Sequence, residues 1–215
     1  QPAGDRLSDA STIRLVTTAR NTVPRSRADH VRAALPEWQR VGASRTVLRW
    51  LSEGVRVQWA ETGPPPPFNM GVTRGSRAER AFLTIEAERC CASGAWRPTT
   101  RLTHVTRAFI VYSKSKPRLV LDLRHLNSYV TPMACRLEGL TALRLLLRRH
   151  DYMFSVDIAD AYHHIGFHDD DVHFFTFGLE LMDGVRFFNT PVLNFGFTNS
   201  PAIFTEVMAA VVSHL

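Results

Sequence analysis

Two aspartates, Asp157 and Asp160, are the side chains best spaced for metal-assisted chemistry in this sequence. Asp157 lies in the apolar run FSVDI (154–158), which predicts a short buried strand, and Asp160 follows at the expected turn. Mg²⁺ takes oxygen ligands, often one or two carboxylates with substrate phosphates, and two-ion phosphoryl transfer needs such carboxylates on rigid backbone. Taken alone, however, an Asp-X-X-Asp pattern is more typical of a turn or a helix cap.

Other polar clusters give weaker indications. Residues 169–171 are three aspartates in a polar turn, which predicts solvated side chains. His163, His164 and His168 include a pair four residues apart, as in some metal sites. Zinc sites normally add cysteine or further histidine at set spacing, and the sequence offers no completing ligand. These histidines are therefore expected to be surface or core residues.

Three cations, Lys114, Lys116 and Arg118, alternate between two predicted strands. At a hairpin tip such cations could hold a triphosphate through charge-assisted hydrogen bonds, although a solvated basic turn is the common alternative. The formal net charge of +6 also favours a polyanionic partner such as nucleic acid. Charge alone is a weak indication, because many basic proteins bind no nucleic acid.

The cysteines and the hydropathy pattern argue against several classes of protein. Cys90, Cys91 and Cys135 fit neither a disulfide framework nor a paired-cysteine zinc site, so reduced thiols of an intracellular protein, cytoplasmic or nuclear, are expected. No apolar run is long enough to span a membrane, so no membrane partner is expected. The opening residues lack an initiator Met and a signal-peptide core, which predicts a chain that begins inside a longer reading frame.

The elements that would position these residues begin with a polar stretch over residues 1–29, which predicts a flexible arm. Residues 30–75 predict a helical and proline-rich region. Within it, Gly54 ends a short helix, and residues 55–59 alternate like a strand.

A longer amphipathic helix is expected over residues 76–93. Ser76 and Glu79 form a capping-box pattern at its start, and Gly94 marks its end. The residues on the face predicted to pack are Ala78, Phe82, Ile85 and Arg89.

The rest of the chain mixes strands and helices without regular βαβ alternation, so an α+β fold is expected. Asp183-Gly184 predicts a tight hairpin turn, and Ser200 with Pro201 predicts the N-cap and first residue of the last helix. The remaining expected elements are strands at 108–113 and 117–123, a helix at 137–149, and hairpin strands at 173–181 and 185–193.

Three segments in this order resemble successive motifs of retroviral and retrotransposon reverse transcriptases. They are KPRLVLDLRHLN (116–127), FSVDIADAYHHIGF (154–167) and LNFGFTNSPAIFTEVM (193–208). Any one could arise by chance, but all three have the right order and spacing. The similarity runs from about residue 107 to 208 and is closest to DIRS-type and related long-terminal-repeat retrotransposons.

The resemblance implies a partial right-hand polymerase. Residues 76–153 would form the fingers, and residues 154–215 the first part of the palm, with an antiparallel sheet and flanking helices. The implied activity is RNA-directed DNA polymerisation, with attack of a primer 3′-hydroxyl on a deoxynucleotide. The implied partners are an RNA or DNA primer–template and dNTPs, and the implied cofactor is a pair of Mg²⁺ ions in the complete enzyme, with Mn²⁺ as an alternative.

Particular positions inherit roles from the resemblance. Asp157 matches the metal-binding catalytic aspartate, and the backbone carbonyl of Ile158 a further metal ligand. Tyr162 matches the steric gate, an aromatic ring that would clash with a 2′-hydroxyl. The implied nucleotide-binding positions are Lys114, Lys116, Arg118, Asp160, Ala161, Tyr162, Phe195 and Gly196, and those implied to hold the fingers together are Asp122, Arg124 and Asn127.

Within the nucleotide-binding set, Arg118 matches the fingers arginine that packs over the base and touches phosphate. Lys114, or alternatively Lys116, would contact the γ-phosphate. The backbone at residues 160–161 would meet the triphosphate, and the pair at 195–196 would line the nucleotide and template pocket.

The sequence departs from the family pattern in two ways. Asn194 stands where the family's third motif has proline, which is expected to loosen that loop. The 215 residues also contain no Tyr-X-Asp-Asp, the motif that supplies the remaining metal ligands. We therefore expect that this chain alone does not polymerise. The alternatives are a nucleic-acid-binding remnant without catalysis and an inert, poorly folded remnant with exposed strand edges.

Overall fold

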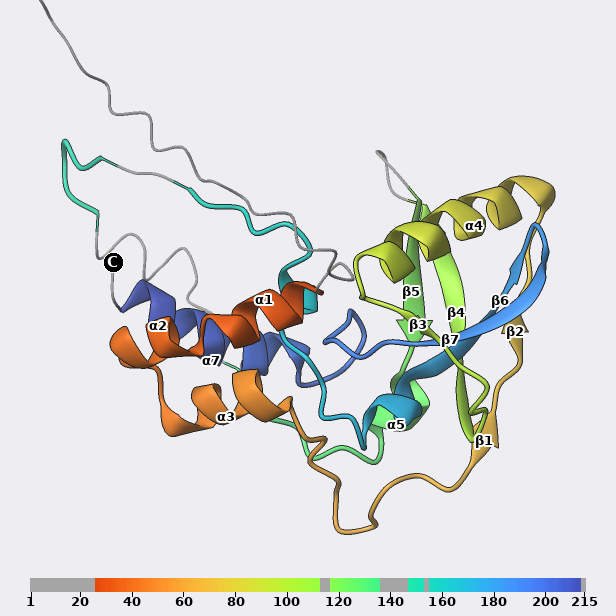
Figure 1. Ribbon diagram of the computed structural model, residues 1–215, viewed down its shortest axis with the longest axis horizontal. Coiled ribbons are helices and arrows are strands. Elements are labelled where there is room, and N and C mark those ends of the chain that lie inside the picture. The colour runs from red at the N-terminus through yellow and green to blue at the C-terminus, as the bar shows by residue number, and fades with distance from the viewer. Residues whose placement is uncertain (1–25, 113–116, 136–146, 153–154, 214–215) are drawn as a thin grey trace, which may run out of the picture.

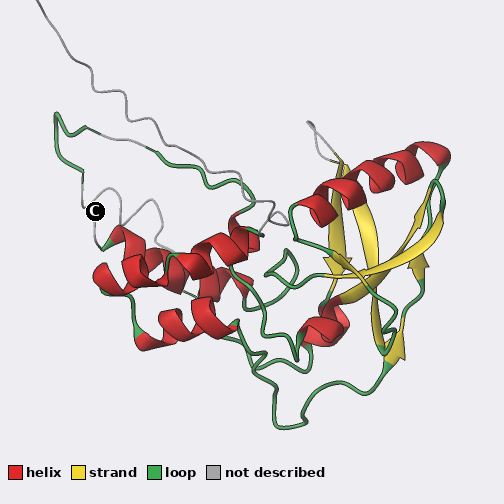
Figure 2. Ribbon diagram, viewed as in Figure 1, coloured by secondary structure: helices red, strands yellow, loops and turns green. Residues whose placement is uncertain are grey.

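A computed structural model describes residues 26–112, 117–135, 147–152 and 155–213 of the chain. Figure 1 shows helices α1, α2, α3 and α7 gathered at one end and the sheet, with the long helix α4 along it, at the other. Figure 2 shows the same arrangement by secondary structure, with α4 and α5 beside the strands. The helices are α1 (Arg27–Ala33), α2 (Leu35–Arg40), α3 (Arg45–Glu53), α4 (Arg77–Ala92), α5 (Arg124–Asn127) and α7 (Ser200–Val212). The strands are β1 (Phe68–Asn69), β2 (Val72–Thr73), β3 (Arg97–Pro98), β4 (His104–Tyr112), β5 (Pro117–Asp122), β6 (Thr176–Leu181) and β7 (Gly184–Asn189).

The sheet is mixed, so the prediction of an antiparallel sheet is wrong. Its strands run in the order β1-β4-β6-β7-β3, with β2 beside β6 and β5 beside β4. The pairs β4–β5, β6–β7 and β3–β7 are antiparallel, whereas β1–β4, β2–β6 and β4–β6 are parallel. The local hairpins are antiparallel because short turns reverse the chain. Residues 113–175 separate β4 from β6, and so long a connection permits the parallel pairing.

Helix α4 confirms its predicted cap but not its predicted buried face. Ser76 Oγ accepts a hydrogen bond from the Glu79 N–H at 3.3 Å, and the Glu79 carboxylate accepts one from the Ser76 N–H at 2.8 Å. Ile85 is exposed, although it was expected to pack. The helix lies along β6, and Thr84 Oγ1 accepts a hydrogen bond from the Met182 N–H, just after that strand, at 3.0 Å. In place of the predicted stripe, the sheet therefore buries a different apolar stripe of the helix. The buried residues of that stripe are Leu83, Ala87 and Cys90.

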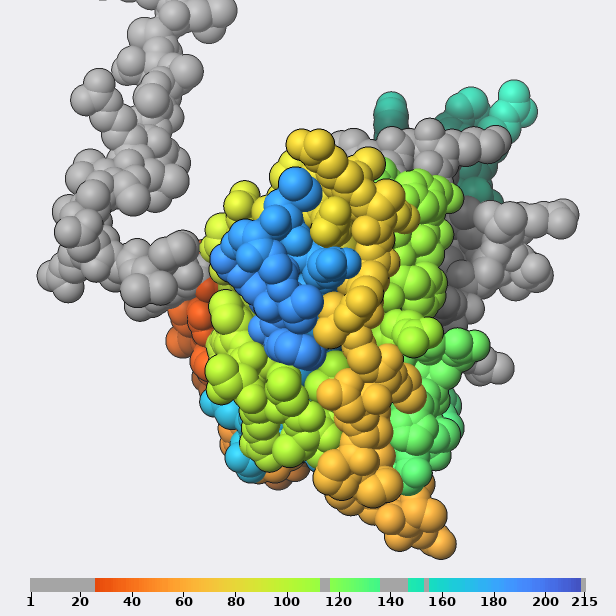
Figure 3. All heavy atoms as spheres, turned by 90° about the vertical axis from the view of Figure 1, so that its right-hand side faces the viewer, coloured from red at the N-terminus to blue at the C-terminus, as the bar shows by residue number. Residues whose placement is uncertain are grey.

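The β6–β7 hairpin forms as the Asp-Gly turn predicts. Gly184 has φ 127°, a conformation that favours glycine. Phe177 pairs with Phe188 across the two strands, and Trp96 packs on Phe177 with ring centroids 5.0 Å apart. Figure 3 shows the tip of this hairpin (blue) lying against the segment that carries β2 and the start of α4 (yellow). The aromatic cluster fixes the sheet and therefore the loops that leave it.

The N-terminal part agrees with the predictions only in part. Helix α3 ends at Gly54 with φ 88°, as expected. Residues 55–59 form single bridges, Val55 with Phe167 and Trp59 with Val130, so the predicted strand is wrong. A strand needs a partner along its length, and here each bridge joins a different loop.

The ends of several predicted elements shift. Helix α1 begins at Arg27, inside the stretch that was expected to be an arm, with Ser26 as its capping-box residue. Helix α7 starts at Ser200, and its N-cap is Asn199 instead of the predicted Ser200. Most of the predicted arm, and residues 137–146 of the predicted helix at 137–149, lie outside the described residues.

Among the described helices, none combines the length and the apolar character that crossing a membrane requires.

Candidate nucleotide-binding site

The segment around Asp157 is an exposed loop, so the prediction of a buried strand at 154–158 is wrong for the part that is described. Residues 155–158 have no regular secondary structure, and Val156 is 74% exposed. Backbone in a strand must hydrogen-bond to a neighbouring strand, and no strand in the described ranges pairs with this segment. The apolar alternation therefore has no surface to pack against, and Asp157 lies exposed.

Immediately after this loop, Asp160 adopts a left-handed conformation with φ 51° and ψ 43°. It begins the 3₁₀ turn Ala161–His164, in which the His163 N–H donates to the Asp160 carbonyl at 2.8 Å. The Asp160 carboxylate accepts a hydrogen bond from Arg27 Nη2 at 3.0 Å and lies 3.5 Å from Arg89 Nη1. Sequence reasoning missed both arginines, because ion pairs across such sequence distances leave no local pattern.

Two of the predicted nucleotide-binding residues, Tyr162 and Phe195, contact each other at this turn, of which Tyr162 is the second residue. The ring of Tyr162 lies 4.9 Å from that of Phe195 and 5.6 Å from that of Phe204 on α7, measured between centroids. Burial raises the pKa of the Tyr162 phenol, so the side chain is neutral at physiological pH. Phe195 is 65% exposed, which leaves much of its ring open to a ligand.

Asn127 joins the first motif to the third. Its Nδ2 donates to the Gly196 carbonyl at 2.7 Å, and its Oδ1 accepts from the Thr198 N–H at 3.1 Å. Gly196 has φ 102°, and a Cβ there would lie 2.8 Å from the Leu121 carbonyl oxygen. Only glycine therefore fits between the two motifs. These bonds give Asn127 a structural role, but they join it to residues 196 and 198, outside the predicted fingers.

The predicted cations are only partly placed. Arg118 is exposed on β5, opposite Val111 of β4. Lys114 and Lys116 lie outside the described residues. Asp122 and Arg124 form a two-contact ion pair, with distances of 2.8 and 2.7 Å, and the guanidinium holds the pKa of the Asp122 carboxyl below its usual range.

The carboxylates of the described segments do not fit a magnesium centre. No three His, Cys, Asp or Glu side chains gather there in a way that could hold a metal ion. Asp157 is a single exposed carboxylate, and Asp160 is held by two arginines. Two-ion catalysis needs several converging oxygen ligands, and these residues do not supply them.

The remaining acidic and histidine candidates have structural roles. Asp169 and Asp170 are exposed as expected, but Asp171 is buried and accepts a hydrogen bond from the Val57 N–H at 2.9 Å. The prediction of a solvated side chain is wrong for Asp171, because it satisfies a buried backbone donor. His168 Nε2 accepts a hydrogen bond from Arg56 Nη2 at 3.0 Å. His163 is partly buried, and its burial lowers its pKa.

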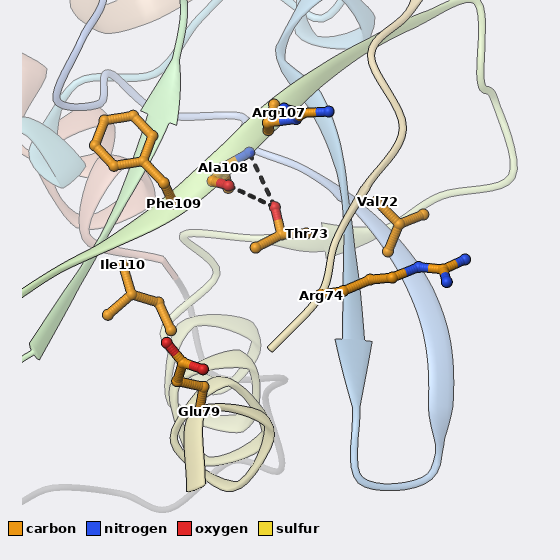
Figure 4. Close-up of a pocket in the computed structure, with 8 residues that line it drawn as sticks. All are labelled: Val72, Thr73, Arg74, Glu79, Arg107, Ala108, Phe109 and Ile110. Carbon is orange, nitrogen blue, oxygen red and sulfur yellow. Dashed lines mark hydrogen bonds between the residues drawn. The ribbon is translucent and has the colours of Figure 1, made fainter. Parts of the chain in front are cut away.

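An open pocket of about 270 Å³ lies between β2, β4 and the start of α4 (Figure 4). Thr73 Oγ1 donates to the Ala108 carbonyl at 2.6 Å and accepts from the Ala108 N–H at 3.1 Å. The Glu79 carboxylate already accepts from Ser76 and Tyr112. None of the predicted site residues lines this pocket, and these polar groups are satisfied within the chain.

Asn194 gives a stability prediction for the third motif. Its side chain is 7% exposed, and both amide atoms lack hydrogen-bond partners among the described residues. We expect Asn194→Leu to raise the free energy of unfolding by about 1 kcal/mol, because a buried unsatisfied amide is lost. Asn194→Pro should add roughly 0.5 kcal/mol more by restricting the unfolded chain, since none of the described hydrogen bonds uses the Asn194 N–H. Urea unfolding followed by tryptophan fluorescence measures both changes.

The control for this prediction is Asn127→Leu, which removes an amide that has partners and should destabilise the protein. If Asn194→Leu destabilises as well, the Asn194 amide has a partner, such as an ordered water, and the prediction is wrong.

Comparison with protein families identifies the class to which this fold and these motifs belong. The family described as reverse transcriptase (RNA-dependent DNA polymerase) matches residues 93–215, more than half of the chain. The chain therefore belongs to the reverse transcriptase family. Members of this family are RNA-directed DNA polymerases that act on nucleic-acid templates and dNTPs and generally use divalent metal ions. No curated protein matches the sequence.

Proposed function

We propose that this chain forms the fingers, over residues 76–153, and the first part of the palm, over residues 154–215, of a retroelement reverse transcriptase of the DIRS or long-terminal-repeat type. The observation that carries the proposal is the convergence of its three motifs. Tyr162 of the second motif packs on Phe195 of the third, and Asn127 of the first bonds to the backbone beside it.

The nucleotide would bind against Tyr162 and Phe195. The Tyr162 ring packs between two other aromatic rings, so it is well supported to act as a steric gate against a 2′-hydroxyl. The exposed face of Phe195 offers a surface on which a base can stack. Gly196, the backbone of residues 160–161, Arg118, and Lys114 or Lys116 would complete the contacts to base and phosphates.

Catalysis is proposed for the complete enzyme only. There, the primer 3′-hydroxyl would attack the α-phosphate of a dNTP with the help of two divalent ions, and Asp157 and the Ile158 carbonyl would be among the ligands. The 215 residues lack Tyr-X-Asp-Asp, and their described carboxylates do not converge. We therefore propose that this chain by itself binds nucleotide and primer–template without polymerising. The alternative is a remnant that binds nucleic acid without selecting a nucleotide.

Salt-dependent binding tests whether Arg118, which is proposed to touch the phosphates of the nucleotide, also contacts the backbone of the primer–template. The 215-residue chain should bind a fluorescent oligo-dT/poly-A duplex with an affinity that falls steeply as salt rises, without sequence preference. We expect Arg118→Ala to reduce the slope of log K against log salt by about 1, because one phosphate contact is lost. Fluorescence anisotropy at a series of salt concentrations measures the slope.

The matched control is Arg186→Ala, which removes an exposed arginine from β7 of the same sheet, where it pairs with Asp183. Equal slopes for the Arg118 variant and the unmodified chain would show that Arg118 does not contact the nucleic acid. A dependence of affinity on base sequence would contradict the proposed mode of binding.

A further inference from the structure

Three segments that are distant in sequence meet beside the turn that presents Tyr162. They are the start of α1, the end of α4, and the residues from Asp160 onward. Ser26, the cap of α1, is buried against Gly94, where an added Cβ would lie 2.7 Å from the Ser26 Cβ. Helix α1 also packs against the turn. An added Cβ at Gly166, just beyond the turn, would lie 3.8 Å from that of Ala28. Helix α1 therefore contacts the turn, and its N-cap contacts the loop that follows α4.

Acidic and basic side chains alternate at this junction and form a network of ion pairs. Asp160 Oδ2 lies 3.0 Å from Arg27 Nη2 and 3.5 Å from Arg89 Nη1. Arg89 is itself fixed by Glu86, through hydrogen bonds of 2.9 and 2.7 Å. A partly buried network of this kind holds its members more firmly than an isolated surface pair does. Burial lowers the pKa of His163, which favours the neutral form of that side chain beside the Asp160 carboxylate.

One acidic member of this network, Asp160, also has an uncommon backbone conformation. Its left-handed conformation is uncommon for a residue with a side chain, although aspartate adopts it more readily than most residues do. From that conformation the chain enters the turn closed by two hydrogen bonds, from the His163 N–H to the Asp160 carbonyl and from the Ile165 N–H to the Tyr162 carbonyl. Tyr162 lies within the turn that these two bonds close, directly after the segment that begins at Asp160.

We infer that Arg27 and Arg89 are positioning residues of the nucleotide site, acting through Asp160 on Tyr162. Both lie upstream of the family match at residues 93–215, so the N-terminal helix α1 and the end of α4 belong functionally to the polymerase site. This inference rests on the proposed role of Tyr162 in nucleotide binding. The arginines themselves touch no reacting group.

Hydrogen exchange of the unliganded 215-residue chain tests the first half of the inference. In the double variant Arg27→Gln/Arg89→Gln, we expect the His163 and Ile165 amides to exchange about tenfold faster, the effect of losing a charged hydrogen bond. The control Arg40→Gln breaks an exposed ion pair with Glu37 in α2 and should leave both amides unchanged. Equal exchange rates in the double variant and the unmodified chain would overturn the inference.

Exchange in the presence of oligo-dT/poly-A and increasing dTTP tests the second half. In the unmodified chain, dTTP should slow the same two amides, and UTP should do so at higher concentration. The double variant should need about tenfold more dTTP and discriminate less against UTP, and Arg27→Lys should behave nearly as the unmodified chain.

The outcomes separate the two claims. If dTTP protects nothing in the unmodified chain, the proposed nucleotide site is wrong, whatever the arginine variants do. If dTTP protects the turn but the double variant needs no more of it, the arginines stabilise the turn without positioning the site, and the inference fails.

Discussion

Mixed with poly-A template, oligo-dT primer, Mg²⁺ and dTTP, the 215-residue chain is expected to incorporate no nucleotide above the level of its Asp157→Asn variant. Two-ion transfer needs carboxylates that converge on both metals. Here Asp157 is exposed on a loop, and Asp160 is held by Arg27 and Arg89. Incorporation of labelled dTTP, followed on a denaturing gel, measures the result.

If coding sequence follows residue 215 and supplies Tyr-X-Asp-Asp, a version continued through it should behave differently. We expect it to extend the primer and Asp157→Asn to reduce the rate by about 1000-fold or more, because metal-ion catalysis contributes several kcal/mol. Asp183→Asn is the matched control, since Asp183 lies in the exposed turn of the β6–β7 hairpin.

Each outcome of this comparison has a defined meaning. Extension by the continued version alone, abolished by Asp157→Asn, supports both the assignment of Asp157 and the need for the further carboxylates. Extension by the 215-residue chain itself would show that those carboxylates are dispensable. A continued version that contains the motif and is insensitive to Asp157→Asn would remove Asp157 from the site.

Replacing Phe175 by alanine is expected to lower the free energy of unfolding by about 4 kcal/mol, since large-to-small changes of a buried phenylalanine remove apolar contact and leave a cavity. The Phe175 side chain is fully buried. It stacks on Phe167 with centroids 4.0 Å apart and meets Phe197 edge-on at 5.4 Å. Urea unfolding monitored by tryptophan fluorescence measures the loss.

Phe109→Ala is the control for this change, because Phe109 on β4 is 44% exposed and should cost less than about 1 kcal/mol. Similar losses for the two variants would indicate that the Phe175 cavity collapses or that the cluster contributes little. Phe167 belongs to the second motif and Phe197 to the third, so Phe175 lies in the core that holds the two motifs together. We therefore expect its loss to weaken dTTP binding as well.

Features that depend on residues close in sequence follow from the sequence alone. The capping box of α4 is set by Ser76 and Glu79, three residues apart, and the β6–β7 turn by Asp183-Gly184. The order and spacing of the three motifs were likewise enough to predict the family that the match at residues 93–215 then showed. In each case residue identity and spacing along the chain are enough, so no contact between distant segments is needed.

Only the tertiary structure decides the features that need a distant partner. Residues 155–158 have the alternation of a strand, but a strand forms only where another backbone lies beside it, and here none of the described strands does. The parallel pairing of β4 with β6, and the burial of Leu83 in place of Ile85 on α4, depend in the same way on which surfaces meet.

The candidate site shows the same division. The identities of Tyr162, Phe195 and Asn127 could be predicted from the motifs, whereas their contacts, and the ion pairs of Asp160 with Arg27 and Arg89, could not. An ion pair between residues so far apart requires that folding first bring the segments together, and no local pattern encodes that approach. The sequence by itself therefore determined the family and those local features, such as caps and tight turns, that neighbouring residues set. The tertiary structure decided which segments pair and which side chains meet.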